Sequence, residues 1–144
     1  MNRQNLILDA WALLALLQRE EPAASKVKSL VQEAQEKRNL DLFVSVINLG
    51  EVYYRVGRKA GALVAQETLE ELRNLGFTIL SATDRRVFQA ADLKRQYAIS
   101  YADAFAVAAA AEQEGILVTG DPELIQLEGI IQVDALSRKT DDPG

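Results

Sequence analysis

The chain of 144 residues contains neither cysteine nor histidine. Their absence excludes disulfide bonds, a Cys nucleophile, a Ser-His-Asp triad, a His general base, and zinc or haem sites with the usual nitrogen and sulfur ligands. Any catalytic chemistry must therefore come from carboxylates, lysines, tyrosines and hydroxyl groups.

Aromatic residues and long apolar runs are also scarce. Aromatics make up 6% of the chain, whereas 21 Ala and 20 Leu supply most of its 49% hydrophobic content, so helices should outweigh strands. The longest uncharged apolar run, residues 104–111, is far shorter than the ~20 residues of a membrane span. Residues 6–17 are not a convincing secretory signal, because Asp9 interrupts them and no small-residue cleavage site follows. We expect a cytoplasmic protein that does not enter a membrane.

Positive charge is in the minority, with 16 Lys and Arg against 21 Asp and Glu and a formal net charge of −5. This balance argues against binding nucleic acid through bulk charge, but it is compatible with an enzyme that uses a few local basic residues. The length fits one domain. We place that domain at residues 1–136, followed by a polar, flexible tail at 137–144.

Apolar segments of strand and helix type alternate along the chain. Strands are expected at residues 5–8, 42–44, 77–80, 116–118 and 130–133. Of the helices between them, the third should be interrupted around Gly57 and Gly61, and the fourth should direct Leu63 inward. The sixth, at residues 102–111, is apolar on nearly all sides. This alternation predicts an α/β fold with a parallel sheet and helices on both faces.

Four acidic residues lie in apolar surroundings rather than on predicted solvent faces. Asp9 ends the first strand, Asp121 follows the fourth, Glu51 lies within the third helix and Asp103 within the sixth. Desolvating an unpaired carboxylate costs several kcal/mol. These side chains should therefore be capped, paired or bound to a cation.

Taken singly, each acid also has a structural explanation. Asp9, Asp103 and Asp121 all stand where helix N-caps or capping boxes are expected. Glu51 can form an ion pair with Arg55, four residues further along the same helix.

Taken together, the acids point to a shared site. The carboxyl ends of parallel strands meet at one crevice, where ligands bind, so Asp9 and Asp121 should lie together. Asp103 joins them only if the connector before its helix returns to that end. Several carboxylates without histidine or cysteine would repel one another unless a hard cation such as Mg²⁺ or Mn²⁺ bridged them. Such clusters support metal-assisted phosphodiester hydrolysis.

Four segments, in this order and spacing, resemble the PIN-domain ribonucleases, and most closely the VapC-type toxins of toxin–antitoxin pairs. The segments are LILD at residues 6–9, INLGEVYY at 47–54, YADAFA at 101–106 and LVTGDPEL at 117–124. The resemblance extends from residue 6 to about residue 133. It implies a PIN-like α/β domain with a five-stranded parallel sheet and the acids gathered at its carboxyl edge.

The resemblance further implies a function and a set of active residues. Asp9, Glu51, Asp103 and Asp121 match the family's catalytic, metal-binding quartet, and Thr119 matches a hydroxyl residue that supports it. The implied activity is Mg²⁺- or Mn²⁺-dependent endoribonuclease cleavage that leaves a 5′-phosphate and a 3′-hydroxyl.

One position departs from the family pattern. The family often has Ser, Thr or Asn two residues after the first Asp, whereas Trp11 occupies this region, in the segment Ala10-Trp11-Ala12. Trp11 is interpreted either as core packing or as an aromatic surface for a base or a partner protein.

An acidic protein must gain its RNA affinity from local basic residues. The candidates for contacts with phosphate are Arg55, Arg58, Lys59, Arg85, Arg86, Lys94 and Arg95.

The segments beside the first two acids carry more large apolar surface than one helix face can bury, around Trp11 to Leu17 and around Val52 to Tyr54. Part of that surface should form a groove for an amphipathic helix. In the resembling toxins an antitoxin fills such a groove and extends a basic side chain toward the acids, so we expect a homodimer that binds a small antitoxin.

Four alternative functions can be weighed against this interpretation, and the sequence disfavours the first two. A haloacid dehalogenase-type hydrolase would need a second Asp where Trp11 stands, and a response-regulator receiver would need a phosphorylated Asp after the third strand, which runs into Ser81-Ala82-Thr83. A housekeeping nuclease, or a PIN-like fold kept as a non-catalytic RNA- or protein-binding module, would share the same motifs.

Overall fold

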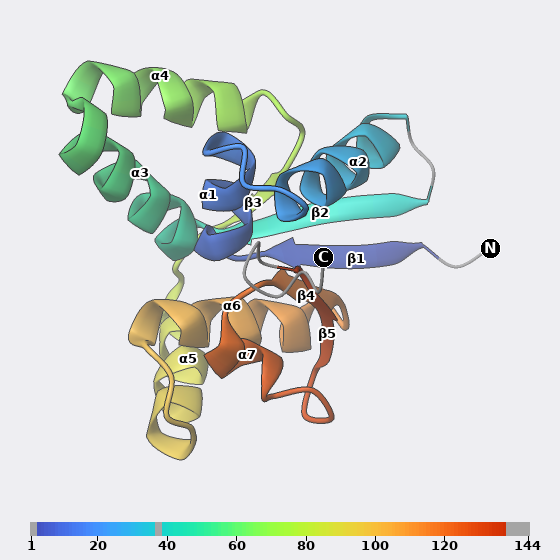
Figure 1. Ribbon diagram of the computed structural model, residues 1–144. Coiled ribbons are helices and arrows are strands. Elements are labelled where there is room, and N and C mark those ends of the chain that lie inside the picture. Colours follow the sequence, from blue (N-terminus) through green and yellow to red (C-terminus); the bar gives the residue numbers. More distant parts are fainter. Residues whose placement is uncertain (1–2, 37–38, 138–144) are drawn as a thin grey trace.

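The computed structural model describes residues 3–36 and 39–137 (Figure 1). The strands are β1 (Gln4–Leu8), β2 (Leu40–Ser45), β3 (Thr78–Leu80), β4 (Ile116–Thr119) and β5 (Gln132–Ala135). The helices are α1 (Ala10–Leu17), α2 (Ala23–Gln35), α3 (Val46–Ala60), α4 (Ala62–Arg73), α5 (Asp84–Gln96), α6 (Tyr101–Glu112) and α7 (Pro122–Ile125). Of the predicted tail at 137–144, only Ser137 lies within the described part.

The strands form one parallel sheet in the order β3-β2-β1-β4-β5. This confirms the predicted α/β class. The order also separates the chain from a response-regulator receiver, whose doubly wound sheet follows the order 2-1-3-4-5. Within the described residues, no helix is both long and apolar enough to cross a membrane.

Helices cover both faces of the sheet, with α1 to α4 on one side and α5 to α7 on the other (Figure 1). The alternation of side chains along β1 divides the core accordingly. Leu6 and Leu8 join a cluster with α1, α2 and α3, whereas Ile7 joins a second cluster with α5, α6 and Leu117. Burial on both faces explains why β1 reads as a continuous apolar run.

Helix α6 is the most enclosed helix of the second layer. Every residue from Ala104 to Ala110 is buried, as the all-round apolar pattern predicts. Ser100 caps its N-terminus by accepting a hydrogen bond from the backbone N–H of Asp103 at 3.0 Å. The short connector at residues 97–100 thereby fixes where the helix starts, and with it the position of Asp103.

Three local expectations are wrong in whole or in part. Helix α3 continues through Gly57 and ends at Ala60, so the predicted interruption lies at Gly61 alone, whose φ of 96° suits glycine. Leu63 points outward and is 68% exposed, because the α3–α4 hairpin projects beyond the sheet at this end (Figure 1). The fifth strand begins at Gln132 rather than Ile130, whose backbone N–H instead donates to the carbonyl oxygen of Leu127 in a turn.

The strand order places a switch point at the centre of the sheet. After β1 the chain adds β2 and β3 on one side, then crosses to add β4 and β5 on the other. The carboxyl ends of the neighbouring strands β1 and β4 therefore flank the crevice in which α/β sheets bind ligands. Asp9 comes directly after β1, and Asp121 comes after β4 with Gly120 between them.

Candidate functional site

Asp9 is the most deeply buried acid of the group, with 1% of its surface exposed. One carboxylate oxygen, Oδ1, accepts a hydrogen bond from the backbone N–H of Ala12 at 2.9 Å and so caps α1. The other, Oδ2, accepts a hydrogen bond from the hydroxyl of Thr119. Asp9 therefore caps α1 and is also bonded to Thr119 at the crevice, so its role as a helix cap does not exclude the predicted role in a shared site.

Thr119 joins the two strand ends. It lies at the end of β4, which pairs with β1 through Leu8 and Val118. Its fully buried hydroxyl donates to Asp9 and accepts from the backbone N–H of Asp121 at 3.0 Å. Thr119 thus holds two of the predicted acids in a fixed relation, which suits the supporting role that the resemblance implies.

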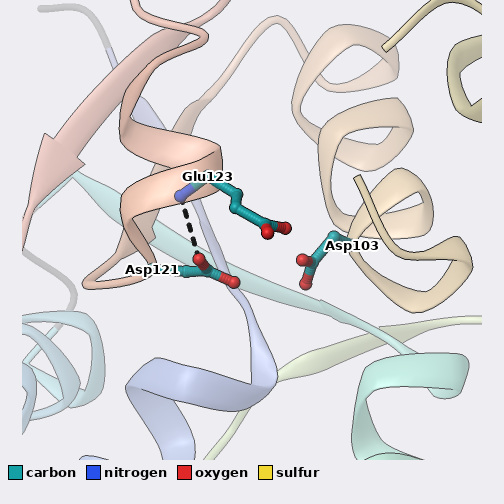
Figure 2. Close-up of side chains that lie close together, drawn as sticks. All are labelled: Asp103, Asp121 and Glu123. Atoms are coloured by element: carbon teal, nitrogen blue, oxygen red, sulfur yellow. Dashed lines mark hydrogen bonds between the residues drawn. The ribbon is translucent and has the colours of Figure 1, made fainter. Parts of the chain in front are cut away.

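A third acid completes a cluster at the start of α7. Oxygens of Asp103, Asp121 and Glu123 lie within 4.8 Å of one another, and Figure 2 shows the three carboxylates facing a common space between α6 and α7. The Oδ1 atom of Asp121 accepts from the backbone N–H of Glu123 at 3.0 Å. The short connector before α6 therefore does bring Asp103 to the crevice.

Glu123 is a site residue that the sequence reasoning missed. It is exposed and lies in the first turn of a four-residue helix, where an acid is expected simply to favour the helix N-terminus. The signal that could have identified it is its spacing, two residues after an Asp that caps the same turn.

Glu51 approaches the cluster from α3. Its side chain is 18% exposed and accepts a hydrogen bond from Nε of Arg55 at 3.1 Å, which is the predicted ion pair. The charge of Glu51 also raises the pKa of Asp103. Asp103 is therefore the acid that links Glu51 electrostatically to the other predicted acids, Asp9 and Asp121.

Asn48 ties the two facing helices together and was also missed. Its Nδ2 donates to the carbonyl oxygen of Ala102 at 3.0 Å, which joins α3 to the first turn of α6. The side chain is fully buried, and its Oδ1 has no hydrogen-bond partner among the described residues. In the sequence Asn48 looks like an ordinary polar residue on a helix, because its burial depends on the packing of α3 against α6.

Two acids of this site, Asp9 and Asp103, have raised pKa values. Burial is the largest cause that raises the pKa of Asp9 to about 7, with smaller contributions from the charges of Asp103 and Asp121. Burial also raises the pKa of Asp103 to about 7, followed by the adjacent carboxylates of Asp121 and Glu51. A like-charge cluster of this kind gains stability from any cation that binds it.

The donor set fits a hard divalent cation. The clustered side chains of Asp103, Asp121 and Glu123 offer carboxylate oxygens as metal ligands, and the chain has no histidine or cysteine to favour a softer metal. Oxygen-only sites suit Mg²⁺ and Mn²⁺. The residues present are therefore consistent with the metal class expected from the sequence.

The basic residues predicted to contact phosphate lie on two helices, α3 and α5. Arg55, Arg58 and Lys59 continue along α3 from Glu51 and are exposed. Arg86, by contrast, binds Glu112 at 3.0 Å and the carbonyl oxygen of Ser81 at 2.9 Å, and it lowers the pKa of Glu112.

Glu112 ends α6 and lies nine residues after Asp103, about 14 Å along the helix axis. The structure therefore does not bring Arg86 to the acids, although its contact with RNA remains a prediction. Arg85 is exposed on the same turn of α5, and Lys94 and Arg95 are exposed at the far end of that helix.

Trp11 packs against the backbone between Thr119 and Asp121. A Cβ atom added at Gly120 would lie 2.3–2.6 Å from three atoms of the Trp11 ring. The ring is half-buried and packs against the cluster of α1, α2 and α3. This supports the packing interpretation of Trp11, because the indole covers the turn that carries Asp121.

Gly120→Ala is expected to lower the free energy of unfolding by about 1–3 kcal/mol, because the added methyl group must displace the Trp11 ring. Urea denaturation measures this. Gly50→Ala on α3 is the matched control, because a Cβ there meets nothing within 4 Å, and it should be neutral or stabilising by up to about 1 kcal/mol. Equal stability of the two variants would contradict the packing of Trp11 on Gly120.

Comparisons with known proteins agree with this geometry. The family model of the PIN domain matches residues 6–130 of the chain. No curated protein matches it significantly in sequence.

Several solved structures share the fold. VapBC2 of Rickettsia felis, bound to a DNA fragment from its promoter, superposes with a TM-score of 0.71 at 15% identity, covering 93% of this chain and 100% of the other. VapC20 of Mycobacterium tuberculosis, a toxin that cleaves the sarcin-ricin loop, gives 0.68 at 16% identity, with coverage of 85% and 95%. A toxin–antitoxin complex of Klebsiella pneumoniae gives 0.64 at 18% identity, with coverage of 92% and 98%.

Proposed function

The chain belongs to the PIN domain family, and from the acids gathered at its central crevice we propose that it is a metal-dependent endoribonuclease. The observation that carries the proposal is the convergence of Asp103, Asp121 and Glu123 within 4.8 Å, beside the buried Asp9 and the ion-paired Glu51. Structural N-caps alone would not require these side chains to meet.

In this proposal Asp9, Asp103, Asp121 and Glu123 hold one or two ions of Mg²⁺ or Mn²⁺, with Glu51 at the rim. Both oxygens of Asp9 already accept one hydrogen bond each, but each keeps a second lone pair for a ligand. When bound, such a cation activates water and neutralises the charge that develops on the leaving oxygen.

The residues of the chain set the geometry of the reaction. Thr119 fixes the orientation of Asp9 relative to the backbone of Asp121. Among the described residues, the side chain of Glu51 is bonded to the exposed side chain of Arg55 alone, so it can turn toward the crevice and orient the attacking water. Arg55 is then available to contact a phosphate of the RNA.

The test is cleavage of RNA by the purified chain in Mg²⁺, in Mn²⁺ and in EDTA, with analysis of the product ends. We expect cleavage only with a cation, leaving a 5′-phosphate. Asp121→Asn should lower the rate by about a hundredfold or more. The matched control is Asp92→Asn, because Asp92 is an exposed acid on α5 that pairs only loosely with Arg95, at 3.8 Å. Cleavage that persists in EDTA or in Asp121→Asn would contradict the proposal, and absence of any cleavage would favour a non-catalytic binding module.

We also propose that the chain is the toxin of a type II pair, acting as a homodimer that binds a small antitoxin. A groove of about 430 Å³ runs between α3 and α4, with apolar walls from Val46, Leu49, Tyr53 and Leu69. Such a groove accepts an amphipathic helix, and one of the similar structures is a toxin–antitoxin complex. Copurification of the product of a short neighbouring reading frame, with light scattering for the dimer, tests this. A chain that purifies alone and is harmless in its host would indicate a housekeeping nuclease.

A further inference from the structure

One face of α3 continues from the acid site onto a basic and aromatic surface. Residues 51, 54, 55 and 58 are spaced three and four apart, so Glu51, Tyr54, Arg55 and Arg58 lie on the same side of the helix. Glu51 contacts Arg55 directly. Anything bound over the later turns of this face is therefore adjacent to the crevice.

Tyr54 is the centre of this surface. Its ring is 48% exposed, and the guanidinium carbons of Arg58 and Arg55 lie 5.3 Å and 6.0 Å from the ring centroid. Cation–π contacts of this kind hold an aromatic ring in a defined orientation. Tyr54 thus presents a partly exposed aromatic ring whose orientation is fixed by two neighbouring guanidinium groups.

A pocket of about 370 Å³ adjoins the ring. It is lined by Leu14, Gln18, Tyr54, Arg55, Arg58 and Lys59, and its volume falls in the range of small-ligand pockets, roughly 300–1,000 Å³. Three of the lining side chains are cationic and none is acidic, in a chain of net charge −5. Within the described residues no carboxylate lies within ion-pair distance of Arg58 or Lys59.

We propose that Tyr54 is a stacking platform for an unpaired base of the RNA strand, with Arg58 and Lys59 contacting the adjacent phosphates. As a statement about the substrate, this rests on the proposed nuclease function. A base stacks on an exposed tyrosine only when it is free of its own duplex, so the platform selects single-stranded segments such as loops. The strand then continues past Arg55 to Glu51 and the acids.

The chemistry of the pocket favours a nucleotide over a peptide helix. An amphipathic helix needs an apolar groove, which the chain offers on the α4 side of α3, where Tyr53 lies with Leu49 and Leu69. The pocket beside Tyr54 is instead rich in positive charge, which suits phosphate. The neighbouring tyrosines therefore face different surfaces and serve different partners in this proposal.

The experiment measures RNA binding in EDTA, which removes the divalent cations that cleavage would require. The probes are a labelled ten-nucleotide oligouridylate and a ribose-phosphate chain of the same length without bases. Tyr54→Ala should weaken oligouridylate binding roughly five- to hundredfold, as expected for the loss of one stacked base, and should leave the abasic chain unchanged. Tyr54→Phe, which keeps the ring, and Phe88→Ala, which removes an aromatic residue that is 67% exposed on α5, should stay within about twofold of wild type.

Arg58→Ala separates the phosphate contact from stacking. It should weaken binding of both probes and reduce the slope of log affinity against log salt by about one. Thermal melting of each variant shows that the fold is kept. Tyr54→Ala with wild-type affinity for oligouridylate, or with equal losses for both probes, would overturn the platform, and so would a loss confined to binding of a protein partner.

The outcomes separate this inference from the nuclease proposal. A wild-type chain that discriminates the two probes through Tyr54 but does not cleave RNA with Mg²⁺ keeps the platform and loses the proposed function. A chain that cleaves RNA but binds both probes alike, with or without Tyr54, keeps the function and loses the platform.

Discussion

Asp103→Asn is expected to make the metal-free protein more stable at pH 8 while eliminating RNA cleavage. In the folded state the pKa of Asp103 is raised to about 7, first by burial and then by the charges of Asp121 and Glu51. At pH 8 the folded protein must therefore carry an ionised group that its surroundings disfavour. Asparagine removes the charge and keeps the shape of the side chain.

The substitution is clean because Asp103 does not cap its own helix. Ser100 provides the side-chain cap by accepting from the backbone N–H of Asp103, and its hydroxyl also lowers the pKa of the Asp103 carboxyl. Because Asp103 is partly exposed to solvent, we expect a gain of about 1–2 kcal/mol in the free energy of unfolding, well below the full electrostatic penalty. Asp92→Asn, an exposed control, should stay within about 0.5 kcal/mol of wild type.

The sign of the effect depends on pH and on metal. A carboxyl group whose folded pKa exceeds its unfolded value favours the fold at low pH, and this advantage is lost as pH rises from about 4 to about 7. The gain in Asp103→Asn should therefore shrink as pH falls below about 7 and disappear near pH 4. Saturating Mg²⁺ should reverse it, because the cation stabilises only the protein that binds it. A variant less stable than wild type at pH 8 without metal would show that Asp103 is not under electrostatic strain.

Much of the site could be predicted because the topology of a parallel sheet decides where the acids that follow its strands lie. Asp9 and Asp121 follow neighbouring parallel strands, and parallel topology alone brings them to one edge. Glu51 and Asp103 lie on helices and could be identified by another signal, the apolar residues that surround each acid in the sequence. These acids also serve as helix caps or ion-pair partners in the structure. Capping patterns in the sequence therefore could not distinguish the site from ordinary helix ends.

The parts that were missed depend on tertiary packing. Asn48 becomes a link between helices only when α3 lies against α6. Glu123 joins the cluster only because α7 begins where Thr119 and Asp121 turn the chain. Asn48 has no local sequence signature, because its contact joins segments 54 residues apart. The one local signal for Glu123 is its spacing two residues after Asp121.

The errors in the fold have the same cause. Ile130 resembles a strand residue by its side chain, yet the turn beginning at Leu127 takes its backbone N–H out of the sheet. Leu63 fits an inward helical position, but α4 begins beyond the edge of the core, where nothing covers it. Hydrophobic pattern identifies which elements exist, and the extent of the layers beneath them decides which apolar residues are buried.

The affinity for Mg²⁺ is expected to rise steeply with pH between 5.5 and 7.5. Asp9 and Asp103 both have a pKa of about 7 in the metal-free protein, whereas a carboxylate must be ionised to bind a cation. Binding therefore displaces protons, and each displaced proton makes the affinity rise by up to tenfold per pH unit below the pKa. With one to two protons displaced, we expect a change of at least tenfold, levelling off above pH 7.5.

Calorimetric titration of Mg²⁺ in buffers of different ionisation enthalpy counts these protons directly. Wild type should release one to two protons per ion near pH 6.5, and Asp9→Asn should release about one fewer. Asp9→Asn keeps the Oδ1 acceptor for the N–H of Ala12, so α1 remains capped, and its amide nitrogen replaces the Oδ2 that accepts from the hydroxyl of Thr119. Glu112→Gln changes an acid at the far end of α6 whose pKa Arg86 already lowers, and it should leave the proton count unchanged. An affinity for Mg²⁺ that does not change across this pH range would contradict the prediction, because it would mean that Asp9 and Asp103 are already ionised without metal.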